Sequence, residues 1–422
     1  MDYENVLSKI RPSKEEVKKT QEIAKKIINK LNKLGYEAVL VGSRARGTFL
    51  SNDRDIDIFF FFPQNTSRKK LEEEGLKIGK KVLRGHGPKV HYAEHPYVKG
   101  KVKGIIIEVV PCYKTKDRII SAVDRTPLHN EFLIQNLRPM HRDEVILLKQ
   151  FLKNMGAYGA GHKVQGFSGY LCELLILHYD KFENLLKAAS KWKQKTVIDI
   201  KGHCKNPEKF KEALVVVDPV DPDRNVAAAV NRTVLSRFIM QSRKFLESPS
   251  EDFFFKKEPV NIKKSIEGRN IVGIVFKYPK DTVEEIVWAQ LEKLAKMLRQ
   301  KIEEQGFEVL GSAYWTDEKS RCSVVLDLNT LKLNNYSKHR GPEVWDAENI
   351  KKFIEKNPNY FFYKSRIYSW KKRSCNTAED CLKKLLKEEE IPSRLAGARK
   401  AKIKRGLNNP HPALEEYFRW YG

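Results

Sequence analysis

Two aspartates and the glycine–serine pair that precedes them are the residues of this chain best suited to chemistry. Gly42 and Ser43 form a small-residue turn, and Asp55 and Asp57 follow shortly after it. Carboxylate oxygens suit Mg²⁺, which keeps several waters and shares the phosphates of a substrate. Glycine lets the backbone approach a phosphate closely, and Ser43 and Arg46 add hydrogen-bond donors. The combination predicts a site that binds a nucleoside triphosphate and transfers its nucleotidyl group.

The two aspartates stand at the start of an apolar run over residues 58–62. This pattern is typical of a strand that enters a buried sheet and leaves its first residues at the rim. Residues two apart in a strand face the same side, so the carboxylates lie roughly 6 to 7 Å apart along it. The Gly-Ser pair alone is a weak signal, and an Asp-x-Asp pair alone is common on solvated loops and strand ends. Together they indicate a cation, because carboxylates buried without one are costly.

A two-metal displacement needs a third carboxylate on a neighbouring strand, and Glu108 is the candidate. One cation then activates the attacking hydroxyl while the other holds the leaving pyrophosphate. Glu108 lies within the apolar, β-branched run 104–111, where a lone acid has no ordinary packing role. The competing interpretation is an acid at a strand edge with its charge in solvent. We predict that Asp55, Asp57 and Glu108 hold Mg²⁺.

The residues just before Gly42 predict the elements that position this site. Ser13 and Glu16 form a capping-box signal, and apolar residues recur at helical spacing until Gly35. The sequence predicts a helix over about 14–34 and a strand over 38–41, which delivers the chain to Gly42.

These and later motifs resemble those of the archaeal, class I CCA-adding enzymes, which are tRNA nucleotidyltransferases of the polymerase-β-like superfamily. Residues 42–48 and 55–57 carry motifs shared by the whole superfamily. The more specific matches are 92–97, 108–113, 121–127, 166–174, 217–221 and 224–227. The resemblance covers residues 13 to about 255 closely and the remainder loosely.

The resemblance implies template-independent addition of C, C and A to the tRNA 3′ end from CTP and ATP. It assigns phosphate binding to Ser43 and Arg46, and it assigns metal binding to the three acids named above. It also implies that His129, Lys149 and Tyr158 line the nucleotide pocket. Arg224 is implied to help choose the incoming base together with the RNA.

One residue departs from the family pattern, because the third acid is usually aspartate and here it is Glu108. The extra methylene extends the reach of the carboxylate by roughly 1.5 Å, the length of one C–C bond.

Three of the implied pocket residues also have ordinary structural interpretations. Lys149 lies at the edge of an apolar stripe in the predicted helix 143–153, so it points either at a phosphate or into solvent. Tyr158 likewise is either a residue of the nucleotide pocket or an ordinary surface residue. A lone histidine such as His129 usually has a structural role.

The charge of the chain favours a polyanionic partner. The 422 residues contain 80 Lys and Arg against 54 Asp and Glu, a net charge of +26, and the pI is near 9.6. Nucleic acid is the partner that fits, and binding should be fast and sensitive to salt. The alternative is a thermophile surface rich in charge networks.

The chain is too long for one ordinary core, and we predict an α+β multidomain protein. Residues 1–140 form a polymerase-β-like nucleotidyltransferase head, 141–255 a helical central domain, and 256–422 an α+β body with an inserted helical tail. The body should contain strands over 271–276 and 322–328 and a helix from Asp281 to Gln305. The tail is placed within 347–405.

The tail carries basic residues interleaved with Tyr363, Tyr368 and Trp370. The basic set is Lys371, Lys372, Arg373, Arg399, Lys400, Lys402, Lys404 and Arg405. Such a pattern suits phosphate binding together with stacking on an exposed base, or else a solvated face over an aromatic core. The family implies that this half grips the acceptor stem and T arm of tRNA.

The remaining features bear on location and assembly. The six cysteines lack metal-binding spacing, which favours an intracellular, reduced, cytoplasmic protein. No stretch is long and apolar enough to span a bilayer, and the N terminus lacks a secretory h-region. The family implies a homodimer, and the aromatic runs 253–255 and 417–421 serve either its interface or the core.

Two other functions remain open from the residues themselves. A poly(A) polymerase or oligoadenylate synthetase shares the Gly-Ser and Asp-x-Asp motifs but differs in nucleotide and primer. A noncatalytic RNA-binding scaffold would keep the fold, although it would have no need of all three acids.

Overall fold

The computed structural model describes residues 1–92, 96–115, 119–255, 261–405 and 412–421. Residues 93–95 of the motif at 92–97 therefore lie outside the described residues. The chain forms two compact units, Met1–Lys257 and Glu258–Gly422. The predicted boundary near residue 140 falls inside the first unit and stays a prediction.

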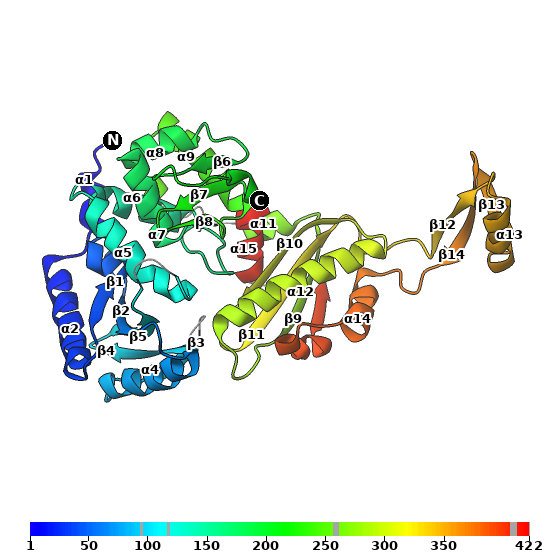
Figure 1. Cartoon of the computed structure of the whole chain (residues 1–422). Helices are drawn as coiled ribbons and strands as arrows, with labels where there is room; N and C mark the ends of the chain where they lie inside the picture. Colours follow the sequence, from blue (N-terminus) through cyan, green and yellow to red (C-terminus); the bar gives the residue numbers. More distant parts are fainter. Residues whose placement is uncertain (93–95, 116–118, 256–260, 406–411, 422) are drawn as a thin grey trace. The chain divides into compact units, whose positions relative to one another are not determined.

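The first unit contains a five-stranded sheet (Figure 1). In spatial order its strands are β1 (Ala38–Val41), β2 (Asp55–Phe62), β5 (Ile105–Tyr113), β4 (Pro96–Val102) and β3 (Lys89–Tyr92). Only the pairing of β2 with β5 is parallel among these strands. The strand that starts with the two aspartates therefore lies in the interior of the sheet.

Two helices, α2 (Lys14–Lys33) and α4 (Arg68–Val82), cover one face of this sheet. The hydroxyl of Ser13 accepts a hydrogen bond from the backbone N–H of Glu16 at 3.0 Å and caps α2. The apolar stripe of α2 packs on Ile56 and Ile58 of β2. The predicted helix and the predicted strand at 38–41 are both confirmed.

The other face of the sheet carries the alternate residues of β2, which include Asp55, Asp57 and Phe59. A short helix, α3 (Gly42–Arg46), and α5 (Arg125–Asn136) lie on this side. The small-residue turn predicted at Gly42 is a single turn of helix, which ends at Gly47 in the left-handed conformation.

The rest of the first unit is mainly helical. It consists of α1 (Glu4–Ile10), 3₁₀ turns at Ala122–Asp124 and Pro207–Lys209, α6 (His141–Asn154), α7 (Gly169–Tyr179), α8 (Phe182–Ala189), α9 (Arg232–Glu247) and α10 (Asp252–Phe255). Three short strands accompany them, β6 (Thr196–Ile198), β7 (Leu214–Asp218) and β8 (Asp221–Asn225). The apolar core gathers around Phe151, whose ring contacts those of Phe182, Phe245 and Phe254.

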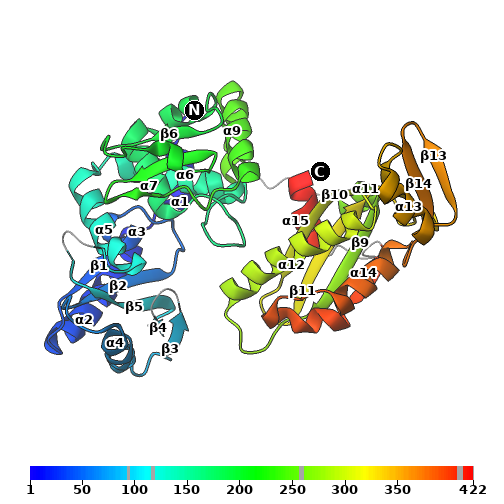
Figure 2. The ribbon, with the colours of Figure 1, turned by 45° about the vertical axis from the view of Figure 1, so that its right-hand side comes forward.

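The second unit is built on a four-stranded antiparallel sheet with α12 (Glu284–Glu304) packed on it (Figure 2). Its strands in spatial order are β10 (Val309–Thr316), β11 (Arg321–Leu328), β9 (Asn270–Lys277) and β15 (Lys402–Arg405). The two predicted strands are confirmed as β9 and β11. The predicted start of the helix at Asp281 is wrong, because that residue has φ +52° and α12 begins at Glu284.

Further helices complete this unit. On the α12 side lie α14 (Ala378–Glu388) and a 3₁₀ segment, Ser393–Lys400. On the opposite side lie α11 (Ile262–Ile266) and α15 (Pro412–Tyr421). Tyr417 and Phe418 are buried in that layer, as Phe254 is in the first unit, so core packing accounts for these three aromatics. The side chains of Trp420 and Tyr421 lie outside the described part.

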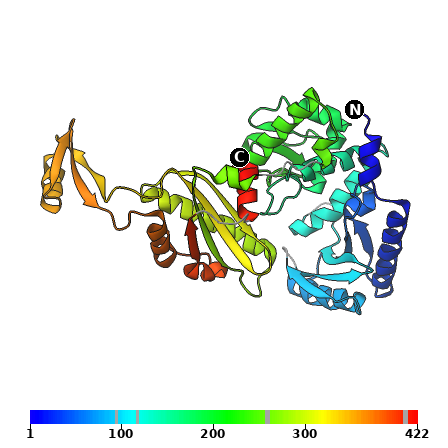
Figure 3. The same ribbon diagram turned by 180° about the vertical axis from the view of Figure 1, so that it is seen from behind.

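A separate three-stranded antiparallel sheet occupies much of the predicted tail (Figure 3). Its strands in spatial order are β12 (Tyr336–Glu343), β14 (Arg366–Lys372) and β13 (Tyr360–Tyr363), and α13 (Ala347–Lys356) packs on one face. The tail is therefore only partly helical. Aromatic residues, which favour strands, fill 360–363 and recur in 366–372.

Cys375 and Cys381 form a disulfide just before and within α14. The prediction that all six cysteines are reduced is wrong for this pair, while the other four are free thiols. In the described ranges, we find no helix with the length and apolar character that crossing a membrane requires.

Candidate active site

A pocket of about 430 Å³ opens in the first unit on the side of the sheet that carries Asp57. Its lining comes from α3, the 3₁₀ turn at Ala122–Asp124, the start of α5, α6, α7, β8 and the segment between α6 and α7. The lining residues are Gly42, Ser43, Arg46, Ala122, Arg125, Thr126, His129, Lys149, Tyr158, Ser168, Gly169, Tyr170, Glu173 and Arg224. The six residues expected to bind the nucleotide, from Ser43 to Arg224, are thus all brought to one cavity.

Helix α3 sets the direction of three side chains. Gly42 has φ +76°, and a Cβ there would lie 2.7 Å from Oδ2 of Asp57, so only glycine fits. Ser43 and Arg46 line the pocket. Arg44 turns the other way, where its guanidinium donates to Oγ1 of Thr20 at 2.9 Å and is buried. The two arginines of the motif therefore have different roles.

Arg46 is held by a buried carboxylate. Its Nε and Nη2 donate to Oε1 and Oε2 of Glu173 at 2.9 and 2.8 Å, a bidentate pair. Burial alone would raise the pKa of Glu173, but the charges of Arg46 and Lys149 outweigh burial and hold it below its ordinary value. Glu173 is therefore ionised, and it fixes the guanidinium at the wall of the pocket.

Lys149 is fully buried rather than at the surface. Its side-chain ammonium donates to the backbone carbonyl of Thr48 at 2.8 Å, at the end of the α3 turn. The interpretation of Lys149 as an ordinary solvent-exposed lysine is wrong. The lysine brings a positive charge to the same end of the pocket as Arg46.

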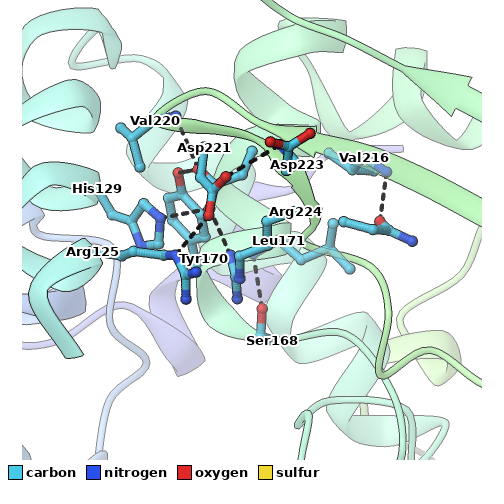
Figure 4. Close-up of polar contacts among 12 residues, drawn as sticks. Arg125, His129, Ser168, Tyr170, Leu171, Val216, Val220, Asp221, Asp223 and Arg224 are labelled. Atoms are coloured by element: carbon cyan, nitrogen blue, oxygen red, sulfur yellow. Dashed lines mark hydrogen bonds and ion pairs between the residues drawn. The ribbon is translucent and has the colours of Figure 1, made fainter. Parts of the chain in front are cut away.

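At the other end of the pocket, the side chains of His129, Tyr170 and Arg224 lie close together (Figure 4), and all three contact Asp218. Nε2 of His129 lies 2.8 Å from Oδ2 of Asp218, and Nη1 of Arg224 donates to the same oxygen at 2.7 Å. The hydroxyl of Tyr170 donates to Oδ1 at 3.3 Å, and the His129 ring stacks on Tyr170 with centroids 4.0 Å apart. His129 and Arg224 are thus fixed by one carboxylate.

The charge states around Asp218 follow from burial and hydrogen bonding. Burial would raise the pKa of Asp218, but the hydrogen bond with His129 and those from Val220 and Arg224 keep it below its ordinary value. Burial lowers the pKa of His129 despite its contact with the carboxylate. At neutral pH a neutral imidazole therefore donates its Nε2–H to an ionised Asp218.

A second ion pair flanks this group, since Nε of Arg125 donates to Oδ2 of Asp221 at 2.9 Å. Arg125, Tyr170, Glu173 and Asp218 were not singled out from the sequence. Glu173 gave a signal of the kind that marked Glu108, because it is a lone acid in an apolar helix. Arg125, Tyr170 and Asp218 gave no signal in the sequence beyond their place in the motifs that resemble those of the family.

The three acids expected to hold a metal lie along one face of the sheet. Asp57 of β2 is paired with Glu108 of β5, and Asp55 precedes Asp57 by one strand repeat. Burial, together with the charges of Glu108 and Asp55, raises the pKa of Asp57 to about 7. Glu108 itself forms an ion pair with Lys99 of β4, with 2.7 Å between Nζ and Oε1.

The donor set fits a divalent cation of the Mg²⁺ type. In the part of the chain that the structure describes, no three His, Cys, Asp or Glu side chains converge closely enough to hold a metal ion unaided. Mg²⁺ does not need such a cage, because it keeps several waters and shares substrate phosphates. Burial and, after it, the neighbouring negative charges raise the pKa of Asp57, and a bound cation would relieve that crowding of charge.

The first unit combines a pocket lined by cationic side chains, carboxylates on a buried strand and a helical turn that begins with Gly42 and Ser43. These features define a polymerase-β-like nucleotidyltransferase. Residues 22–129 match the family described as "Nucleotidyltransferase domain". Residues 143–255 match "tRNA nucleotidyltransferase, second domain", and 267–393 match "CCA-adding enzyme, C-terminal domain". The chain belongs to the family of CCA-adding enzymes.

Relatives named CCA-adding enzyme match over most of their length. The relative from Methanothermobacter thermautotrophicus is 37% identical, over 92% of this chain and 89% of its own. The relative from Archaeoglobus fulgidus is 40% identical, over 89% of this chain and 87% of its own. The relative from Methanocaldococcus jannaschii is 39% identical, over 90% of this chain and 89% of its own.

Proposed function

We propose that this protein adds C, C and A to the 3′ end of tRNA, from CTP and ATP and without a nucleic-acid template, in the pocket described above. The observation that carries the assignment to this pocket is that six residues from distant parts of the chain line it together. Its size is in the range of small-ligand sites. Family membership supports the reaction itself.

Within the pocket, the two ends take different parts of the nucleotide. Arg46 and Lys149 supply positive charge, and Ser43 a hydroxyl, where the triphosphate is bound. Arg224 and His129, fixed by Asp218, lie where the guanidinium can donate to the edge of a base and the free imidazole nitrogen can accept from it. Tyr158 lines the cavity beside Gly169 and Lys149.

Asp55, Asp57 and Glu108 would hold Mg²⁺ at the wall next to Gly42. When bound, the metal acidifies the terminal hydroxyl of the RNA and stabilises the negative charge of the departing pyrophosphate. The chain's own contribution is positioning. Arg46 and Lys149 orient the triphosphate, so that the RNA 3′ oxygen forms its bond to the α-phosphorus while the bond to pyrophosphate breaks.

The test uses a tRNA that ends at its discriminator base, with labelled CTP, ATP, UTP and GTP supplied singly and together. Stepwise addition of two C and one A, abolished by Asp55→Ala, is expected. A tract of A would instead identify a poly(A) polymerase. An absence of extension by a folded protein would identify a noncatalytic RNA-binding scaffold.

We propose that the open face of the β12–β14–β13 sheet contacts the tRNA, in the acceptor-stem and T-arm region. The strand register places Lys338 opposite Trp370, Arg340 opposite Tyr368, and Phe361 beside Tyr368, on the face that α13 does not cover. The Phe361 ring stacks on those of Tyr368 and Trp370, at 5.8 and 5.4 Å. Basic and aromatic side chains that alternate in this way suit phosphates and exposed bases.

This contact is tested by Trp370→Ala, with Phe362→Ala as the matched control. Both side chains are more than half exposed, and Phe362 lies on the opposite face, paired with Ile367. We expect Trp370→Ala to raise the KM for tRNA about 10-fold, since one stacked base is worth roughly 1 to 3 kcal/mol, and to leave the kcat unchanged. Equal KM values for the two variants would exclude this face as an RNA contact.

We further propose a homodimer and a cytoplasmic location, as the family resemblance implies. Phe255, with 40% of its surface exposed in the first unit, is an apolar residue that such an interface would cover. Sedimentation equilibrium of the purified protein tests the assembly, and cell fractionation tests the location.

A further inference from the structure

A lysine lies in register with the proposed metal-binding acids, and nothing in the reaction so far uses it. Lys99 of β4 is paired with Glu108 of β5, and Glu108 is paired with Asp57 of β2. Directly paired residues in a sheet point to the same face. Three adjacent strands therefore place one ammonium group and two carboxylates in a single row next to Gly42.

The ion pair in this row is close and only partly exposed. Nζ of Lys99 lies 2.7 Å from Oε1 of Glu108, and the two side chains are 31% and 21% exposed. The same ammonium lies 5.6 Å from the centre of the Tyr97 ring, which limits its freedom on the other side. Both partners are therefore restrained by their neighbours.

We propose that Lys99 is a tethered cation that occupies Glu108 until a divalent metal displaces it, and that it thereby sets the metal affinity of the active site. The inference rests on the proposed role of Asp55, Asp57 and Glu108 as metal ligands. Lys99 acts through Glu108 and is a positioning residue. It stabilises the crowded carboxylates in the metal-free enzyme, and its charge opposes a metal ion at Glu108.

The physical basis is competition between two cations for one carboxylate. A glutamate has three rotatable side-chain bonds, so Glu108 can keep its backbone register and still exchange the ammonium for a metal. A metal at Glu108 must weaken the 2.7 Å ion pair, because it draws on the same carboxylate and brings positive charge close to Lys99. Removal of the ammonium therefore leaves Glu108 without its counter-ion and favours the metal.

The test measures Mn²⁺ binding to the full-length protein without RNA or nucleotide, from the electron paramagnetic resonance signal of free Mn²⁺. We expect Lys99→Met to bind Mn²⁺ about 3- to 10-fold more tightly than wild type, a modest factor because solvent screens the pair. Lys99→Arg keeps the charge and should bind as wild type does.

Lys101→Met is the matched control. Lys101 lies on the same strand and the same face, and its register partner is Ile106 rather than an acid. Loss of its charge should leave Mn²⁺ affinity nearly unchanged. Circular dichroism spectra confirm that each variant is folded, and Lys99→Gln replaces Lys99→Met if the latter does not fold.

The outcomes separate this inference from the proposed function. If wild type shows no Mn²⁺ site that Asp57→Asn removes, either in this experiment or when it is repeated with CTP present, the proposed metal site itself is wrong. If that site exists and Lys99→Met binds Mn²⁺ no more tightly than Lys101→Met does, the inference about Lys99 alone is overturned. Weaker Mn²⁺ binding by Lys99→Met than by wild type would also overturn the inference about Lys99, since Lys99 would then strengthen metal binding.

Discussion

Glu173 on α7 and Arg46 on α3 form a bidentate ion pair in which both side chains are almost wholly buried, 1% and 7% exposed. The hydroxyl of Thr48 also donates to this carboxylate, and Lys149 binds the backbone carbonyl of the same threonine. The phosphate-binding end of the pocket is therefore one connected network. Its anchor is Glu173, which contacts both Arg46 and Thr48.

Glu173→Gln should disable the enzyme through Arg46. Loss of the negative charge leaves Arg46 buried without a counter-ion, which we expect to lower the free energy of unfolding by about 3 to 5 kcal/mol. The KM for CTP should rise because the guanidinium loses its fixed orientation. Urea unfolding and steady-state kinetics measure the two effects. Glu22→Gln, at an exposed position of α2, is the control, and equal stability of the two variants would contradict the prediction.

Asp218→Asn should loosen nucleotide selection. The amide replaces a carboxylate that orients His129 and Arg224, so both groups lose their common partner. We expect kcat/KM for CTP to fall on the order of 100-fold, as is typical when a reacting group is misplaced by about 1 Å. Incorporation of UTP relative to CTP should rise. The prediction fails if the variant keeps the selectivity of wild type.

Gly42→Ala should separate backbone strain from steric conflict with Asp57. The new Cβ would meet Oδ2 of Asp57 at 2.7 Å, and the residue would keep a positive φ that costs about 1 to 2 kcal/mol. Gly85→Ala is a matched control, because its φ is +82° and its Cβ would meet no atom within 4 Å. We expect Gly42→Ala to lose more stability than Gly85→Ala, because only Gly42→Ala adds the conflict with Asp57 to the backbone strain. CCA addition should be lost only in Gly42→Ala, and equal activities would contradict the packing described.

The raised pKa of Asp57 predicts a pH-dependent stability in the metal-free enzyme. Between about pH 4 and 7 the folded state binds more protons at Asp57 than the unfolded state does, so stability falls as the pH rises. Since one pKa unit is worth about 1.4 kcal/mol, the loss is at most about 4 kcal/mol. In EDTA, Asp57→Asn should therefore be more stable than wild type at pH 8, with no such gain at pH 4.

Thermal unfolding in EDTA across this pH range measures the effect. Glu22→Gln removes an exposed carboxylate from α2, on the other face of the sheet, and is the control. If Asp57→Asn is less stable than wild type at pH 8, the carboxylates do not oppose each other as described.

The elements with strong local signals were predicted well from the sequence. The cap at Ser13 and the apolar stripe of α2 depend on residues close in the chain, and so does the strand that starts at Asp55. The environment of Lys149 could not be predicted, because α6 has apolar residues on more than one side and only the packing against Thr48 decides which way the lysine points. Lys99 was missed for a similar reason, since its partner is defined by strand register.

In the second unit, the main sheet was predicted in part and the tail less well. The apolar strands β9 and β11 are clear in the sequence, whereas β12 contains Lys338, His339 and Arg340 and has no apolar alternation. Its pairing with β14 is a long-range interaction that sequence periodicity does not report. The register of that pairing, in turn, decides which aromatic and basic residues share a face.

The parallel pairing of β2 with β5 has a consequence for how the enzyme is made. Asp57 can pair with Glu108 only after the hairpin of β3 and β4 and then β5 have been synthesised. Arg46 can pair with Glu173 only after α7 has left the ribosome. A nascent chain that stops between these two points carries the complete set of acids but not the anchor of its phosphate-binding arginine. The pocket is therefore complete only after β8, which carries Arg224, has been synthesised, and a truncated product that ends before α7 should not bind nucleotides.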